Sequence, residues 1–355
     1  MKALVDSHLK QIISEGLVSH MSSDIDLREY IQPASIDLPI GDSVYLVKHK
    51  FLPFESDVFA SMKDYCVTKF DAQDGVVLYK GQTYLIPCLK VHLSDDIFWK
   101  VSPKSSIGRI DVLVRTVFDN IWLYDTIKAW SEGELWLEVT PQSFNIKVFK
   151  GISLSQIMFF DMTDYWGILI YDPQTILLDV DNNQPLSNPM FCGEDMVVSL
   201  WLMSDVIGYI ALNTNYIIDL SQVNSLDYHD FFRELFCLPW HWVPRISLDQ
   251  WKFYILMTKE IIQVPQEYSI ELVPFSHLLW EVRVHYAWFL DPWFCSTCVL
   301  EMRPHDDLMI YHGQPICLVH VYHNKWVPEK LYGSCNNNYQ CQKWARLSKY
   351  FISPS

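Results

Sequence analysis

The sequence predicts a mainly β protein in which two tandem barrel or jelly-roll domains follow a short N-terminal helix. Short runs rich in β-branched and aromatic residues are separated by turn residues; examples are 43–47, 83–86, 135–139 and 145–148. These runs do not alternate with long helical patterns, which disfavours a parallel α/β sheet. Half of the 355 residues are apolar and 15% are aromatic, so two cores of ordinary size can be filled. Barrels or sandwiches of short strands fit this pattern best.

The only clear helical pattern stands near the N-terminus. Leu9, Ile12, Ile13 and Leu17 fall on one face at helical spacing. Gly16 stands near the end of this pattern and a polar stretch comes after it, which predicts that the helix is short.

The strand pattern occurs twice along the chain. The matched segments are 84–86 and 101–105 in the first copy, and 254–256 and 272–276 in the second. Their offset is about 170 positions and drifts only as loop lengths change, which indicates two copies of one β domain. We therefore expect a first domain over 1–165, a linker over 166–189 with two prolines, and a second domain over 190–355. Residues 327–355 are polar and are expected to form an extended C-terminal arm.

Charge and cysteine usage restrict the possible partners. The formal net charge of −15 argues against binding to nucleic acid or to an anionic membrane. No leader pattern opens the chain, and the most apolar stretch, 197–212, contains Asp205 and Gly208, so it is a poor membrane span. Nine cysteines, an odd number without a regular spacing, favour a reduced, cytoplasmic setting.

A short polar segment between two strand patterns, 103–109, is the strongest candidate for ligand binding. It contains Lys104, Ser105, Ser106, Gly108 and Arg109. Hydroxyl and backbone N–H groups donate to phosphate oxygens, the glycine lets the backbone approach, and the two cations neutralise charge. These residues are suited to a triphosphate, although the same composition also occurs in ordinary solvated loops.

Two carboxylates stand at matching places in apolar strand patterns. Glu138 follows a leucine in the first copy, and Glu301 follows a leucine in the second. A carboxylate in such a run is costly unless it is paired, functional or turned outward to water. Asp125 and Asp291 precede these glutamates and could order a sugar hydroxyl or simply form turns.

The cysteines give only weak support for zinc. Cys295 and Cys298 form a CxxC pattern, and Cys192 stands two positions before Glu194. Zinc nucleobase deaminases combine such elements, but they place a proline before the CxxC pair, and here the parts lie in different strand patterns. Two unrelated cysteines are the favoured interpretation.

Several motifs together resemble one family. They are 32–38 with 41–42, the 103–109 segment, the strand that holds Leu-Glu, His285-Tyr286-Ala287 with Asp291-Pro292, and the tail segments 331–334, 339–342 and 347–349. They are similar to those of 2′-deoxycytidine 5′-triphosphate (dCTP) deaminases, especially the doubled bacterial form. The resemblance implies two dUTPase-like β domains and hydrolytic conversion of dCTP to dUTP and ammonia. It also implies a glutamate that activates water, Mg²⁺ carried by the triphosphate, and no zinc.

The resemblance assigns roles to individual residues. Glu301 or Glu138 matches the catalytic glutamate, and Ser105 lies near the reacting centre. Asp125 or Asp291 matches the aspartate on the deoxyribose side. The other matches are Lys104, Ser105, Ser106 and Arg109 for the phosphates, and Tyr332 and Gln342 for the tail over the nucleotide. The family also implies dTTP as an inhibitor and a homotrimer or another homo-oligomer.

The two copies differ where the polar segment should recur, because residues 275–280 contain no Lys or Arg. We therefore hypothesise one composite site, in which the first copy supplies Lys104 to Arg109 and the second supplies Asp291, Glu301 and the tail. Glu138 is then dispensable.

Departures from the family leave two alternatives to simple deamination. Trp280, Trp288, Trp293 and Cys295 stand where the doubled family tends to carry glycine, so an indole near Asp291 could fill the base pocket or distort its turn. One alternative is a bifunctional enzyme that continues to dUMP. The other is a nucleotide-binding relic without turnover.

Overall fold

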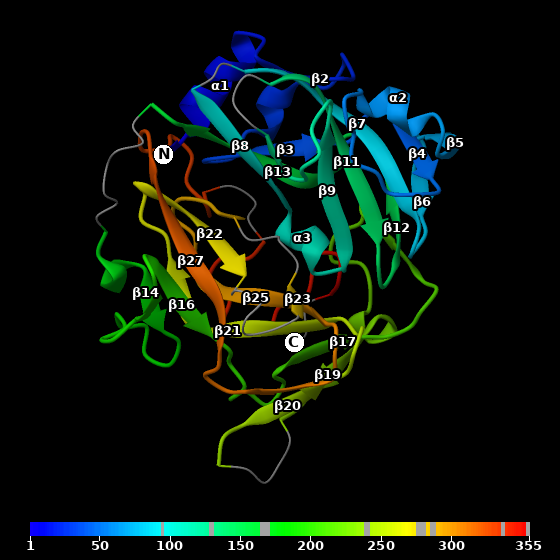
Figure 1. Ribbon diagram of the computed structural model, residues 1–355. Coiled ribbons are helices and arrows are strands. Elements are labelled where there is room, and N and C mark those ends of the chain that lie inside the picture. The colour runs from blue at the N-terminus through cyan, green and yellow to red at the C-terminus, as the bar shows by residue number, and fades with distance from the viewer. Residues whose placement is uncertain are drawn as a thin grey trace.

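The computed structural model describes residues 1–93, 96–127, 131–163, 171–237, 242–274, 282–284, 289–334 and 338–352. The chain is mainly β, which confirms the predicted fold class (Figure 1). The helical elements are short: α1 (Asp6–Ser14), η1 (Leu27–Tyr30), α2 (Val58–Met62), α3 (Ser105–Gly108), η2 (Pro173–Thr175) and η3 (Tyr228–Asp230). Helix α1 is the predicted N-terminal helix, and it buries Leu9 and Ile12. Among the described residues, no helix has the length and apolar character needed to cross a membrane.

The first half of the chain forms one sheet of its own. Its strand order is β5-β4-β7-β11-β9, and β2 pairs with β7. The bounds are β2 (Val18–His20), β4 (Ser43–Val47), β5 (Cys66–Asp71), β7 (Thr83–His92), β9 (Val112–Phe118) and β11 (Glu132–Pro141). The expected strands at 43–47, 83–86 and 135–139 lie within β4, β7 and β11.

The second half repeats this sheet. Its order is β19-β17-β21-β25-β23, and β14 pairs with β21. The bounds are β14 (Leu177–Asp179), β17 (Gly208–Ala211), β19 (Phe232–Leu235), β21 (Tyr254–Gln263), β23 (Val282–Val284) and β25 (Cys295–Pro304). Strand β14 lies inside the expected linker, 166–189, yet it pairs with the second-half sheet. The strand register agrees with the internal repeat. Glu138 pairs with Leu85 and Glu301 pairs with Ile255, and these two partners stand at the same place in the matched segments 84–86 and 254–256.

A larger sheet joins the two halves. Strand β1 (Lys2–Ala3) lies between β13 and β27, antiparallel to the first and parallel to the second. The first half contributes β3 (Ile36–Pro39), β8 (Ile97–Pro103), β10 (Thr126–Ile127) and β13 (Ser153–Asp161). The second half contributes β15 (Met190–Cys192), β16 (Asp195–Ser199), β22 (Tyr268–Pro274), β24 (Phe289–Leu290) and β27 (Pro315–Asn324).

Two small sheets complete the architecture. One consists of β6 (Val76–Leu78), β12 (Asn145–Val148) and β18 (Ile217–Asp219), and the other pairs β20 (Arg245–Leu248) with β26 (Leu308–Tyr311). The first of these also crosses between the halves, because β12 and β18 are parallel neighbours.

The halves share an apolar core that fixes their relative position. The ring of Phe144 packs edge-on against Phe231 and Phe232, with centroids 5.5 and 5.1 Å apart. Burial of such aromatic surface stabilises the contact between the halves. Figure 1 shows the result that matters for function: α3 of the first half lies next to β25 of the second.

Candidate composite nucleotide site

A polar cavity of about 240 Å³ lies between the two halves. It is lined by eight of the residues that the sequence singles out: Lys104, Ser105, Ser106, Arg109, Asp291, Glu301, Tyr332 and Gln342. Glu138 and Asp125 do not line it. The structure therefore brings together the first-half 103–109 segment, the second-half carboxylates and the C-terminal arm, which is the arrangement of the composite-site hypothesis.

The 103–109 segment connects β8 to a single helical turn, α3. Lys104 precedes that turn, and its backbone N–H donates to Leu154 O at 3.0 Å, which fixes the turn on β13. A Cβ at Gly108 would overlap the Glu301 carboxyl, so glycine allows direct contact between the two halves at this point. Glu301 therefore lies against the turn that carries Ser105 and Ser106.

Arg109 is held by the C-terminal arm. Its Nη1 donates to Gln342 Oε1 at 3.2 Å and to Arg346 O at 2.8 Å, and its guanidinium lies 3.8 Å from the centroid of the Tyr339 ring. The side chain is buried, and Nε has no hydrogen-bond partner among the described residues. An unpaired buried N–H of this kind is an expected position for a ligand oxygen.

Glu301 is a buried carboxyl that lines the same cavity as Arg109. Only 2% of the residue is exposed, and Oε2 has no hydrogen-bond partner among the described residues. Burial raises the pKa of Glu301 well above its usual value, Arg109 opposes that shift, and Asp111 adds to it. A carboxyl with a raised pKa in a cavity can exchange a proton with a reactant near neutral pH.

Asp291 connects the site to the N-terminal motif at 32–38. Its Oδ1 accepts from the backbone N–H of Ala34 at 3.1 Å, and burial raises its pKa to about 7. Asp37 of the same motif forms an ion pair with Lys104 and accepts from Gln32 Nε2 at 3.3 Å. The motif therefore positions groups from both halves around the cavity.

The C-terminal arm covers the cavity by pairing with the start of β25. Gln342 Nε2 donates to Thr297 O at 2.7 Å, and the Thr297 N–H donates to Gln342 O at 3.2 Å. Tyr332 packs its ring 5.3 Å from that of Phe294. These contacts exclude bulk water from the space around Glu301 and Arg109.

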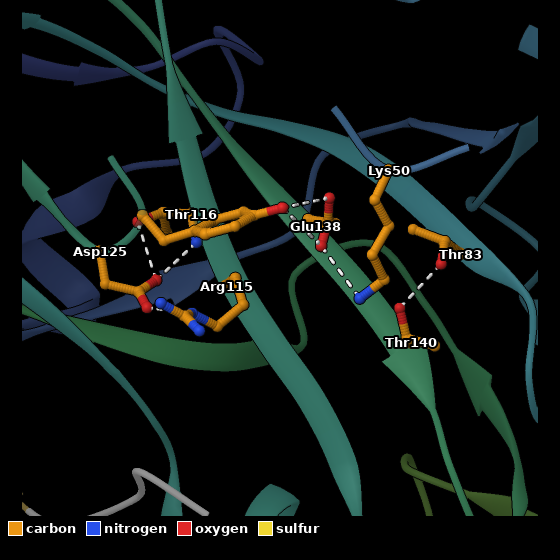
Figure 2. Close-up of polar contacts among 8 residues, drawn as sticks. Lys50, Thr83, Arg115, Thr116, Asp125, Glu138 and Thr140 are labelled. Carbon is orange, nitrogen blue, oxygen red and sulfur yellow. Dashed lines mark hydrogen bonds and ion pairs between the residues drawn. The ribbon is translucent and has the colours of Figure 1, made fainter. Parts of the chain in front are cut away.

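Glu138, the counterpart of Glu301, is occupied by its own neighbours (Figure 2). Its Oε1 lies 3.1 Å from Lys50 Nζ, and the Tyr124 hydroxyl donates to its carboxylate at 3.3 Å. Asp125 forms an ion pair with Arg115 and accepts from the Thr116 N–H at 2.7 Å. Burial raises the pKa of Asp125 to about 6. The carboxylates of Glu138 and Asp125 are thus both bonded to side chains or backbone groups of the first half.

The structure also places the cysteine and tryptophan positions. Cys298 lines the cavity, whereas Cys192 is exposed on β15, and the described residues contain no cluster of His, Cys, Asp and Glu that could hold a metal ion. Trp293 adopts a φ of 76°, which suits the usual glycine, but its indole is half exposed and does not line the cavity. Trp280, Trp288 and the 285–287 motif lie outside the described residues, as do 275–280.

Sequence reasoning missed several cavity residues. Asp37, Gln32 and Tyr339 belong to the motifs that carry the family resemblance, but the motifs alone do not show that their side chains meet Lys104 or Arg109. Lys349, in the tail motif at 347–349, also lines the cavity, but the sequence assigns it no role. Gln156 lines the cavity as well and does not stand out in the sequence.

The architecture matches a solved structure over almost its whole length. The match is the 2′-deoxycytidine 5′-triphosphate deaminase from Agrobacterium tumefaciens, at 30% identity, covering 94% of this chain and 98% of that chain with a TM-score of 0.82. The protein is therefore of the class with the dUTPase-like fold.

Family models identify the group within that class. The model of the 2′-deoxycytidine 5′-triphosphate deaminase N-terminal domain matches residues 2–163, and that of the C-terminal domain matches 177–351. The chain belongs to the 2′-deoxycytidine 5′-triphosphate deaminase family. Comparison with curated proteins gives no match.

Proposed function

We propose that the protein hydrolyses dCTP to dUTP and ammonia in the composite cavity, with Glu301 as the catalytic acid and base. The observation that carries this proposal is the direct contact of a buried, incompletely bonded Glu301 with the segment that holds Lys104 to Arg109. Family membership supplies the substrate.

In the proposed reaction, Glu301 takes a proton from water as the oxygen attacks C4 of cytosine. The same carboxyl then delivers a proton to the departing 4-amino group, which leaves as ammonia. Its raised pKa favours this double role, because the carboxyl then holds the proton taken from water until the amino group leaves. The covered cavity keeps the carboxyl away from bulk water during the reaction.

The other residues of the cavity bind and orient the nucleotide. Ser105, Ser106 and Arg109 donate to phosphate oxygens, and Lys104, held by Asp37, adds positive charge. Asp291 faces the deoxyribose and, with its pKa of about 7, can donate a hydrogen bond as well as accept one.

Mg²⁺ and zinc differ in how well they fit this cavity. The lining residues include one cysteine and no histidine, a donor set that does not suit tetrahedral zinc. Asp37 is already paired with Lys104, so the proposed Mg²⁺ rides on the triphosphate and neutralises part of its charge there. Inhibition by dTTP stays a prediction.

Product analysis with dCTP and Mg²⁺ tests the proposal. Ammonia and dUTP should form in equal amounts, and Glu301→Gln should abolish both. A zinc-selective chelator should leave the rate unchanged. Formation of dUMP and pyrophosphate would indicate the bifunctional alternative, whereas dCTP binding without ammonia release would indicate the relic and refute the proposed activity.

A further inference from the structure

Lys349 is a cation that the C-terminal arm places at the cavity. Its carbonyl accepts from the Asn224 N–H at 2.8 Å, and its own N–H donates to the Tyr339 hydroxyl at 3.2 Å. The neighbouring Ser348 Oγ donates to Ser106 O at 2.7 Å. The backbone of this part of the arm is therefore fixed against both the second half and the 103–109 segment.

The side chain of Lys349 lines the cavity and is partly buried. Burial lowers the pKa of its ammonium, Lys104 lowers it further, and Asp37 opposes the shift. Among the described residues, no carboxylate lies within ion-pair distance of this ammonium, because Asp37 pairs with Lys104 instead. A half-buried cation without its own counter-ion, facing a cavity, is a suitable partner for an anion.

The charges around the 103–109 segment also favour an anion at Lys349. Asp37 offsets the charge of Lys104, and Nη1 of Arg109 is already bonded to Gln342 and Arg346. A triphosphate carries several negative charges, which these two cations compensate only in part. Lys349 lines the same cavity as Lys104 and supplies a further positive charge, and among the described residues this ammonium forms no ion pair of its own.

We propose that Lys349 binds the triphosphate of the substrate, so that the arm contributes a cation to the site as well as a cover. This inference rests on the proposed function and deepens it. In this proposal the turn at Lys349 is part of the phosphate subsite. The contact of the arm with Ser106 then serves to hold Lys349 at that subsite.

Inorganic tripolyphosphate isolates this subsite from the base and the sugar. We would compare the wild type with Lys349→Gln and Lys349→Arg, and use Lys343→Gln as the matched control, because Lys343 is exposed on the same arm and the charge change is the same. Lys349→Gln should weaken tripolyphosphate binding, measured by calorimetry, and raise the KM for dCTP, each about tenfold. Its kcat should change little, Lys349→Arg should retain most of the affinity, and Lys343→Gln should match the wild type.

Equal tripolyphosphate affinity in the wild type and Lys349→Gln would overturn the inference, and so would equal losses in Lys349→Gln and Lys343→Gln. If Lys349→Gln does not fold, as judged by circular dichroism, Lys349→Met and Lys349→Arg provide the comparison between an apolar and a charged side chain. A wild type that binds tripolyphosphate but releases no ammonia from dCTP would count against the proposed reaction and leave the phosphate subsite supported.

Discussion

At the scale of single residues, the two glutamates show how identical strand positions acquire different chemistry. Glu301 and Glu138 share a register in the repeated sheets and are both 2% exposed. Lys50 and Tyr124 saturate Glu138, whereas Glu301 keeps one oxygen without a partner among the described residues. The two carboxyls therefore differ in their partners, and we expect substitution to separate their roles.

Glu301→Gln should lower kcat for dCTP by about a thousandfold, because general acid–base catalysis contributes factors of this size. Glu138→Gln should change kcat by no more than about threefold, because its carboxylate is engaged in an ion pair outside the cavity. Steady-state kinetics of the two variants measures both effects. Similar losses in the two variants would contradict the assignment.

Glu301→Gln should also stabilise the folded protein by about 1 kcal/mol at pH 8, as removal of an unfavourable site charge often does. Because folding raises the pKa of Glu301, the folded state keeps a proton that the unfolded chain releases above about pH 4.5. The unfolding free energy of the wild type therefore falls as pH rises through that window, and the glutamine variant lacks this contribution. Denaturant unfolding at pH 5 and pH 8 checks this; an identical pH dependence in both proteins would refute it.

At the scale of elements, the site depends on the close packing of β17, β21 and β25. Gly208 begins β17, and a Cβ there would overlap the carbonyl oxygen of Ile255 and approach its carbonyl carbon to 3.2 Å. Ile255 is the cross-strand partner of Glu301. Gly208 therefore allows β17 to lie close to β21, the strand that pairs with Glu301, the proposed catalytic carboxyl.

Gly208→Ala should destabilise the protein by about 2 kcal/mol, because the overlap is with backbone that cannot rotate away. Ala211→Ser, at the other end of β17 and only partly buried, is the matched control and should change stability by no more than about 0.5 kcal/mol. Thermal unfolding of both variants provides the measurement. An unchanged melting temperature for Gly208→Ala would show that β17 can shift without cost.

Strands and motifs could be predicted from local patterns, but the tertiary contacts between them could not. The strand expected at 145–148 coincides with β12, and the repeated Leu-Glu pair marks equivalent positions. The contact of Ala34 with Asp291 and that of Lys50 with Glu138 join residues far apart in sequence. Topology sets such contacts, and periodicity carries no information about them.

At the scale of the whole molecule, the cavity is lined by residues from both halves of the chain and from the C-terminal arm. The first half provides the 103–109 segment, for which we propose phosphate binding, the second half provides Asp291 and Glu301, and the arm covers them. The sheet that both halves share through β1, and the packing of Phe144 against the second half, fix the halves relative to each other. The expected homotrimer stays a prediction.

Complementation between two inactive variants tests the composite intrachain site most directly. Lys104→Ala removes a first-half group and Glu301→Gln a second-half group, so the two variants are coexpressed and also mixed after joint unfolding and refolding. A site built within each chain predicts that the mixture shows only the sum of the two residual activities. Recovery of a substantial fraction of the wild-type rate would mean that the 103–109 segment and Glu301 meet across subunits, and would contradict the account.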